Sequence, residues 1–310
     1  MKHQAPLLPQ QVHVIERGWL SANSIVCLEG ESATVVDTGY VTQAAQTLQL
    51  LRATLDGRGL ARIINTHSHS DHVGGNASLQ RAYGCSITVP AGIAAAIERW
   101  DEDFLLLRPA AQQSERFRHD AVLQAGAEFE AGGLVWRALP APGHDMEALV
   151  FHCESKRLLI SGDALWRDGF GIQFAEIAGT APGLAATKAT LEMIGRLPVD
   201  AVIPGHGAPF VDFDEAMARA LRRVAAFEEE PLRMARNAMK ALFIYKLLEV
   251  GAVPAEGMAA FLDAIPYFHD VFPRLEHASV GALAGWLRDE LLSAGVIVLK
   301  DGDLLPTQQA

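Results

Sequence analysis

Short apolar runs alternate with helical patterns over the first two-thirds of the chain. Ser24–Leu28 and Thr34–Val36 are apolar runs separated by turn-forming residues, which predicts a β-hairpin. Val41–Leu55 then carries apolar residues at helical spacing, and Ala61–Asn65 follows as a short strand. This order of elements is typical of an α/β fold.

The alternation continues to about residue 213. Residues 91–125 interrupt it with a stretch that is helical in composition. Two interpretations stay open for this stretch, an insertion (a lid) that covers a site or a plain pair of packing helices. Elsewhere the pattern predicts two more helices, at Asn76–Tyr83 and Pro182–Gly195, and further strands at Ser86–Val89, Leu134–Leu139, Leu149–Cys153, Arg157–Ile160 and Ala201–Ile203.

From Asp214 onward the pattern becomes mainly helical. A tight-turn signal at Asp301-Gly302-Asp303 predicts a final hairpin. We therefore expect two domains, 1–213 and 214–310, of which the second is helical and winged-helix-like. Its helices are predicted at Glu215–Glu230, Leu232–Val250, Met258–Ile265 and Val280–Ser293, and its hairpin strands at Val296–Lys300 and Leu304–Leu305.

Composition and charge narrow the possible functions. Half of the 310 residues are hydrophobic and 20% are charged, which excludes a disordered chain. No apolar run approaches the ~18 residues of a membrane span, and Met1–Gln10 has no apolar segment of a signal peptide. We therefore expect no membrane contact and a cytoplasmic protein. The formal net charge of −11 argues against nucleic acid as a partner, while an apolar C-terminal domain leaves a homodimer open.

Side chains able to bind a metal ion are concentrated in the segment Thr66-His67-Ser68-His69-Ser70-Asp71-His72. Three imidazoles and a carboxylate lie within six residues, directly after an apolar strand. Zinc and similar metals prefer these ligands. In an extended loop His67 and His69 project to one side and can bind one ion, while Asp71 and His72 point elsewhere and can serve a second ion.

A complete metal site needs more ligands than this segment supplies. Three further candidates are His144, Asp163 and His206, each in a glycine-containing loop after a predicted strand. Strand ends at one edge of a sheet can converge on one cleft, so we expect these residues to join the histidine-rich segment. The three cysteines, Cys27, Cys85 and Cys153, are widely spaced, form no CxxC pair and are expected to be buried free thiols.

The order of these motifs resembles the metallo-β-lactamase-fold hydrolases with a glyoxalase II-like core. The resemblance covers roughly residues 12–210 and includes Val35-Val36-Asp37-Thr38-Gly39, which is similar to an early motif of that family. It implies a four-layer αββα sandwich of two mixed sheets. It also implies that Asp37 has a structural role beside the site and is not a ligand.

The resemblance further implies a pair of divalent ions, with zinc favoured and iron or manganese as alternatives. His67, His69 and His144 would bind one ion, Asp71, His72 and His206 the other, and Asp163 would bridge the two. After His144 the chain continues Asp145-Met146-Glu147, which departs from the family pattern and leaves the neighbouring turn uncertain. Asp163 itself replaces the cysteine typical of the antibiotic-hydrolysing branch, which argues against β-lactams as natural substrates.

Four functions compete on this basis. The first is a hydrolase of esters, thioesters or lactones, in which the ions activate a hydroxide, Asp163 orients it and Asp71 orients it or moves a proton. The second is a nuclease or phosphodiesterase, and the third a mononuclear iron persulfide dioxygenase, which a complete second site disfavours. The fourth is a non-enzymatic module. We favour a small acyl or ester substrate, with candidate pocket residues Trp166, Phe170, Phe174 and Tyr40, and Asn23 as a weaker candidate.

Overall fold

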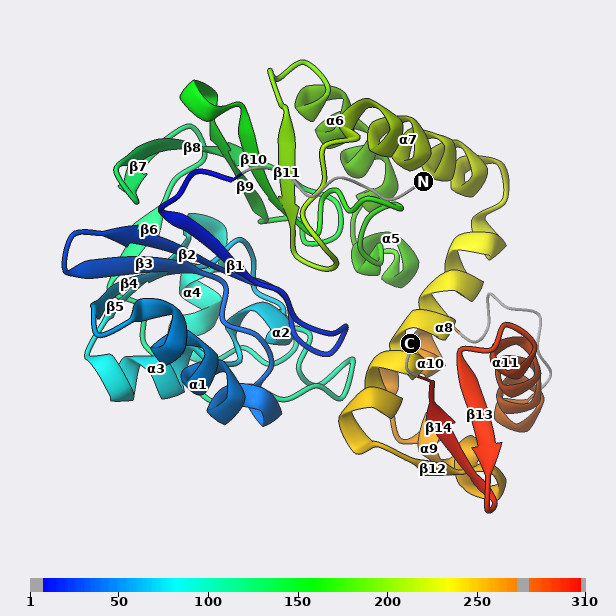
Figure 1. The fold of residues 1–310 in the computed structure, drawn as a ribbon. Coiled ribbons are helices and arrows are strands. Elements are labelled where there is room, and N and C mark those ends of the chain that lie inside the picture. The colour runs from blue at the N-terminus through cyan, green and yellow to red at the C-terminus, as the bar shows by residue number, and fades with distance from the viewer. Residues whose placement is uncertain (1–7, 272–278, 308–310) are drawn as a thin grey trace.

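The computed structural model describes residues 8–271 and 279–307, so residues 1–7 of the Met1–Gln10 segment lie outside the described part. Two β-sheets stand face to face in the middle of the molecule (Figure 1). The first has the order β1-β2-β3-β4-β5-β6 and the second β11-β10-β9-β8-β7. Their strands are β1 Val12–Ile15, β2 Ser24–Glu29, β3 Ser32–Val36, β4 Gly59–Ile64, β5 Ser86–Pro90, β6 Ala121–Leu123, β7 Glu128–Ala131, β8 Leu134–Pro140, β9 Leu149–Cys153, β10 Leu158–Gly162 and β11 Ala201–Pro204.

The side chains along each strand alternate between the two faces of the sheet, and this determines what each face packs against. On β2, Ile25 and Cys27 belong to the apolar cluster between the sheets, whereas Val26 belongs to the cluster beneath the helices. On β9, Phe151 points between the sheets and Val150 points outward. Because successive side chains of a strand face opposite ways, strands buried on both faces must be apolar throughout.

Helices cover both outer faces and complete the four layers. Helices α1, α3 and α4 lie over the first sheet, and α6 and α7 over the second (Figure 1). This arrangement confirms the predicted four-layer αββα sandwich. The elements are η1 Val41–Gln43, α1 Ala44–Leu55, α2 Ser70–Val73, α3 Asn76–Tyr83, α4 Ala91–Arg99, η2 Glu154–Lys156, α5 Phe174–Ala178, α6 Gly183–Ile194 and α7 Phe213–Glu229.

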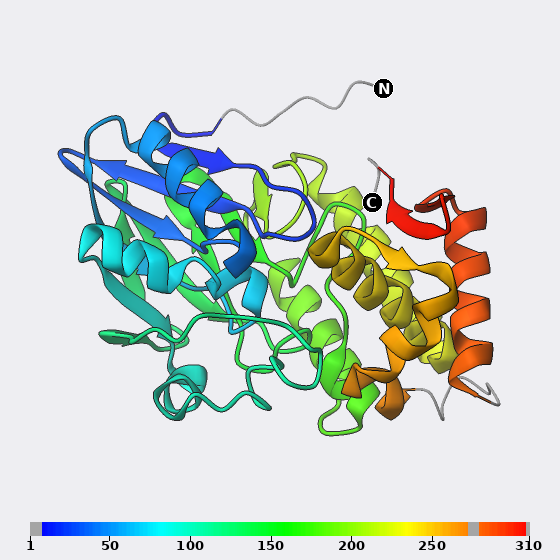
Figure 2. The same cartoon turned by 90° about the horizontal axis from the view of Figure 1, so that it is seen from below.

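The C-terminal part packs against one end of the sandwich (Figures 1 and 2). It contains a three-stranded sheet of order β12-β14-β13 among helices, and its apolar residues share one cluster with α6 and α7. Pro231 stands at the first position of α8, where a missing amide hydrogen has no cost. The elements are α8 Pro231–Val250, β12 Val253–Pro254, η3 Ala255–Gly257, α9 Met258–Asp263, α10 Pro266–Val271, α11 Val280–Ser293, β13 Ile297–Lys300 and β14 Asp303–Pro306.

Residues 91–125 are less helical than their composition indicates. Only Ala91–Arg99 is an α-helix; turns follow, and the segment ends in strand β6 at the edge of the first sheet. Gln112 of this segment reaches the pocket described below. No helix of the described part is both long enough and apolar enough to span a membrane.

Candidate metal centre and its pocket

Four strand ends at one edge of the sandwich carry the predicted ligands. His67 and His69 follow β4, and Asp71 and His72 lie in the short helix α2. The remaining three follow the strands β8, β10 and β11, which run in one direction, at His144, Asp163 and His206. The loops after these strands therefore meet, as the strand-end argument predicts.

All seven side chains come together in two adjoining groups. His67, His69 and His144 form the first group. His69 Nδ1 lies 3.1 Å from His67 Nε2 and 2.7 Å from His144 Nε2. Three imidazole nitrogens facing one another at these distances have the arrangement of a shared metal ligand set. The second group consists of Asp71, His72, Asp163 and His206.

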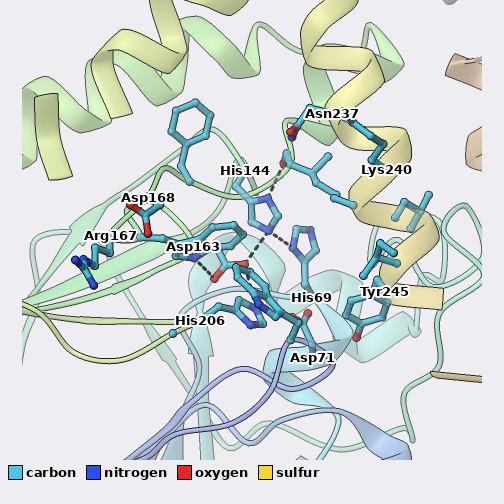
Figure 3. Close-up of a pocket in the computed structure, with 18 of the residues that line it drawn as sticks. His69, Asp71, His144, Asp163, Arg167, Asp168, His206, Asn237, Lys240 and Tyr245 are labelled. Carbon is cyan, nitrogen blue, oxygen red and sulfur yellow. Dashed lines mark hydrogen bonds and ion pairs between the residues drawn. The ribbon is translucent and has the colours of Figure 1, made fainter. Parts of the chain in front are cut away.

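Asp163 lies between the two groups. One carboxylate oxygen, Oδ2, lies 3.3 Å from His144 Nε2 in the first group and 3.8 Å from His206 Nε2 in the second. The other oxygen, Oδ1, lies 3.4 Å from His72 Nε2 and accepts a hydrogen bond from Trp166 Nε1 at 3.0 Å. This position, shown in Figure 3, is the one a carboxylate needs in order to bridge two ions.

Hydrogen bonds behind the cluster orient its imidazoles. His72 Nδ1 donates to Asp37 Oδ2 at 2.7 Å, and His67 Nδ1 donates to Thr66 Oγ1 at 2.9 Å. Thr66 Oγ1 in turn donates to Asp37 at 2.7 Å. His144 Nδ1 donates to a backbone carbonyl. In each case the second ring nitrogen is left to face the cluster, as in the outer shell of metal sites.

The electrostatics of the site fit a divalent cation. Burial, reinforced by the neighbouring His144, lowers the pKa of His69 to about 4, which keeps the ring neutral and able to bind metal. Burial alone would raise the pKa of Asp163, but attraction to His72 and His206 outweighs it and holds that pKa well below the usual range. The neutral imidazole of His69 and the ionised carboxylate of Asp163, both held away from water, suit a positively charged ligand.

The ring nitrogen His72 Nε2 also fits a bound cation. This atom is buried, and among the described residues it makes no hydrogen bond of good geometry, although Asp163 Oδ1 and Asp71 Oδ2 stand 3.4 and 3.7 Å away. Buried polar atoms in folded proteins are nearly always satisfied. A cation between these groups would satisfy all three, so the donor set fits a metal ion.

A cavity of about 790 Å³ opens from the cluster toward the C-terminal helices. Trp166, Phe170 and Phe174 line it, as the sequence analysis predicts. Tyr40 does not. Its ring is fully buried, packs on Tyr245 and holds the amide of Gln113 through its hydroxyl, so its prediction as a pocket residue needs correction. Asn23 binds the backbone of the loop around His206 instead of lining the cavity.

Several residues beside the cluster and its pocket were not predicted. Trp19 stacks on His206 with ring centroids 5.1 Å apart, and Tyr245 of α8 lines the pocket near Asp71 (Figure 3). Asp145, the departure noted after His144, accepts hydrogen bonds from the amide and hydroxyl of Ser68. It thereby ties the His144 loop to the His67–His69 loop, so the unusual turn is well anchored. None of these residues has a local sequence signal.

Comparisons with known proteins agree with this geometry. Hydroxyacylglutathione hydrolase from Methylococcus capsulatus is 35% identical over 125 residues, 39% of this chain and 40% of that protein. The chain thus spans less than half the length of the curated relatives it matches. Two solved structures share the fold. A mutant metallo-beta-lactamase from Cronobacter sakazakii has a TM-score of 0.58 and 21% identity over 73% of this chain and 96% of its own.

The second solved structure includes the C-terminal part. A metallo-beta-lactamase family protein from Thermus thermophilus covers 97% of this chain and 100% of its own, with a TM-score of 0.59 and 18% identity. The family model described as "Metallo-beta-lactamase superfamily" matches residues 17–206, which include all seven clustered side chains. The chain therefore belongs to the metallo-beta-lactamase superfamily.

Proposed function

We propose that the protein is a metal-dependent hydrolase of small thioesters or carboxylic esters, lactones included. The observation that carries the proposal is the convergence of five imidazoles and two carboxylates beside a largely apolar cavity. The relatives named hydroxyacylglutathione hydrolase support a thioester as the substrate class. The complete second group of four ligands argues against a mononuclear iron dioxygenase.

In this proposal His67, His69 and His144 would hold one divalent ion, Asp71, His72 and His206 would hold the other, and Asp163 would contact both. Such ions supply a hydroxide at neutral pH and polarise the carbonyl of the substrate. Zinc is the favoured metal, because imidazole and carboxylate suit it, with iron and manganese as alternatives. The chain itself fixes the ligands, excludes water and positions the acyl group.

Individual side chains have separate tasks. Asp163 Oδ2 faces both groups of ligands, and the bond from Trp166 Nε1 to Oδ1 keeps the carboxylate in that orientation. Asp71 Oδ2 accepts from His206 Nε2 at 3.0 Å and lines the cavity, so it can receive or return a proton at the substrate side. Phe174 packs on His69 and His144 and shields the reacting carbonyl from water.

Paired assays on the metal-loaded protein test this function. We expect turnover of a p-nitrophenyl ester and an acyl thioester, and little turnover of bis-p-nitrophenyl phosphate. His69→Ala should lose bound metal and more than about 100-fold in activity together, because it removes a direct ligand. His269→Ala, an exposed histidine far along the chain, is the matched control and should change neither. Faster turnover of the phosphodiester by orders of magnitude would instead assign the protein to the phosphodiesterases.

We also retain three broader proposals. The domain division near residue 213 follows β11, the last strand of the two sheets, with α7 over the second sheet lying at the junction, and a winged-helix-like second domain is supported by the order α8, β12, α9, α11, β13, β14. The buried free thiols of all three cysteines support a reducing compartment such as the cytoplasm.

A further inference from the structure

The helix α8 contributes one stripe of side chains to the cavity. Asn237, Lys240, Ala241, Ile244, Tyr245 and Leu248 all line it, and their spacing of three and four residues places them on one helical face. The two ends of this stripe lie at different distances from the metal cluster. Tyr245 lies near Asp71 of the metal cluster, whereas Asn237 and Lys240 lie farther up the helix (Figure 3). Tyr245 lies eight positions after Asn237 on the helix, an axial rise of about 12 Å.

Arg223 of α7 lines the same cavity. Its guanidinium carbon lies 5.4 Å from the ring centroids of both Phe170 and Phe227, so the cation makes cation–π contacts with both phenyl rings. The backbone of Gly169 packs directly on it, since a Cβ at Gly169 would come within 2.6 Å of a guanidinium nitrogen. The side chain is therefore fixed in place and partly buried.

Arg223 differs from the other arginine and lysine side chains that line the cavity, Arg167 and Lys240, in its lack of a carboxylate partner. Arg167 pairs with Asp212 at 3.5 Å, and Lys240 pairs with Glu290 at 3.4 Å. No carboxylate within the described ranges 8–271 and 279–307 lies at ion-pair distance from Arg223. Burial lowers the pKa of Arg223, and repulsion from Arg233 lowers it further. A partly buried cation without a counter-charge costs free energy that an anionic ligand recovers.

We infer that Arg223, with Asn237 and Lys240, forms an anion-binding subsite for a carboxylate or phosphate group at the end of the substrate remote from the scissile bond. This inference rests on the proposed function and extends it to the substrate's far end. The guanidinium offers several N–H donors, and the side chain of Asn237, which makes no hydrogen bond within the described residues, offers an amide. Both helices lie beyond the residues that the family model matches.

The experiment compares two p-nitrophenyl esters of equal length. One is the neutral decanoate, and the other is the half-ester of decanedioic acid, which carries a carboxylate at its far end. The wild type should have a KM about 10- to 100-fold lower for the half-ester. Arg223→Gln should abolish this difference by raising the KM of the half-ester, with kcat for the neutral ester within about twofold of wild type. Arg222→Gln, an exposed arginine next to it, is the matched control and should keep the preference.

Other outcomes contradict the subsite. Equal kcat/KM losses for both esters in Arg223→Gln would make Arg223 a support for the loop that carries Asp163. An unchanged preference, or none in the wild type, would also overturn the inference. Arg223→Lys, which keeps the charge, should retain part of the preference and guards against a glutamine variant that fails to fold.

Two further experiments distinguish a failure of the subsite from a failure of the proposed hydrolase function, and a carboxylate ligand from a phosphate. Calorimetric binding of decanedioate and decanoate needs no turnover, so a tighter diacid that depends on Arg223 supports the subsite even if the protein hydrolyses neither ester. Decanoyl-coenzyme A compared with the thioester of N-acetylcysteamine tests whether the anion is a phosphate on the leaving group. Arg223-dependent preference in this pair alone would assign the subsite to phosphate, and in the ester pair alone to carboxylate.

Discussion

Gly205 lies so close to the proposed metal centre that any side chain there would collide with it. A Cβ at this position would come within 2.2 Å of Asp163 Oδ1 and 2.9 Å of His72 Cε1. The carbonyl oxygen of Gly205 also accepts a hydrogen bond from the backbone N–H of Asn23 at 2.7 Å, which fixes the loop that carries His206. Residue 205 must therefore be glycine, because there is no room for a side chain.

Gly205→Ala should accordingly displace Asp163 and empty the second group of ligands. We expect about one bound metal per chain instead of two, measured by elemental analysis, and a loss of activity above about 100-fold. Gly285→Ala, a helical glycine with open space around it, is the control and should change neither quantity. Two tightly bound metals in Gly205→Ala would contradict the geometry described here.

Asp37 acts on the centre through His72. It adopts φ of 57°, a left-handed conformation that aspartate tolerates better than most residues, and it binds the amide and hydroxyl of Thr66. Asp37→Asn should weaken metal binding by about 10- to 100-fold, because the partner of His72 Nδ1 loses its charge. Metal affinity by competition with a chromophoric chelator measures this effect. An unchanged affinity would show that the bond to His72 is not needed.

Single residues also show the limits of sequence reasoning. The histidine-rich segment is recognisable because its ligands are adjacent, and the isolated His144, Asp163 and His206 follow strands, which places them at one edge. Tyr40 was misjudged because proximity to a motif in sequence does not determine which way a ring points. Arg223 could not be found at all, since its significance depends on two phenyl rings from different elements.

At the scale of elements, hydrogen bonds join α8 to the segment 111–113. Lys246 donates to the backbone of Ala111 and pairs with Glu249, and Gln113 donates to Glu249 at 2.7 Å. The side chains of Lys246 and Glu249 are both more than nine-tenths buried. These contacts hold the helix that forms one wall of the cavity.

Glu249→Ala leaves the Lys246 ammonium buried without a carboxylate. We expect the free energy of unfolding to fall by about 3 kcal/mol, measured by urea denaturation. Replacing Lys246 as well, in Lys246→Met/Glu249→Ala, should recover much of that loss, because no charge is then left buried. Glu256→Ala, at an exposed position, should cost little. A double variant no more stable than Glu249→Ala would contradict this explanation.

The pattern of apolar positions predicted most elements but missed those with weak patterns. Helix Asn76–Tyr83 and strand Leu149–Cys153 match their predicted bounds, because a glycine stop and a continuous apolar run define them. Strands β6 and β7 were not predicted, because they are short edge strands with exposed or charged residues. The pattern of α8 predicts a helix but cannot say that one stripe of it faces a cavity.

At the scale of the whole molecule, the pocket joins parts of the chain that are far apart in sequence. The metal cluster comes from the sandwich, and the opposite wall comes from α7 and α8. The shared apolar cluster that includes Phe170, Phe227 and Phe243 makes this junction continuous. The C-terminal part therefore shapes what can reach the centre.

The buried imidazoles give the metal-free protein a pH-dependent stability. Burial lowers the pKa of both His67 and His69, to about 4 for His69, so their contribution is complete above about 6.5 and is lost as the pH falls below that value. Burial lowers the pKa of His72, but Asp163, Asp37 and Asp71 raise it well above its usual value, so its contribution stays constant below 6.5. The melting temperature of chelator-treated protein should therefore fall between pH 6.5 and 4, less steeply in His69→Asn. A pH-independent melting temperature over this range would contradict the account.

The central claim is that seven side chains from the segments after four strands hold two ions at one centre. Anomalous diffraction from crystals of the zinc-loaded protein tests it directly. We expect two peaks, one among His67, His69 and His144 and one among Asp71, His72 and His206, with Asp163 in contact with both. A single peak, or metal bound away from these residues, would contradict it.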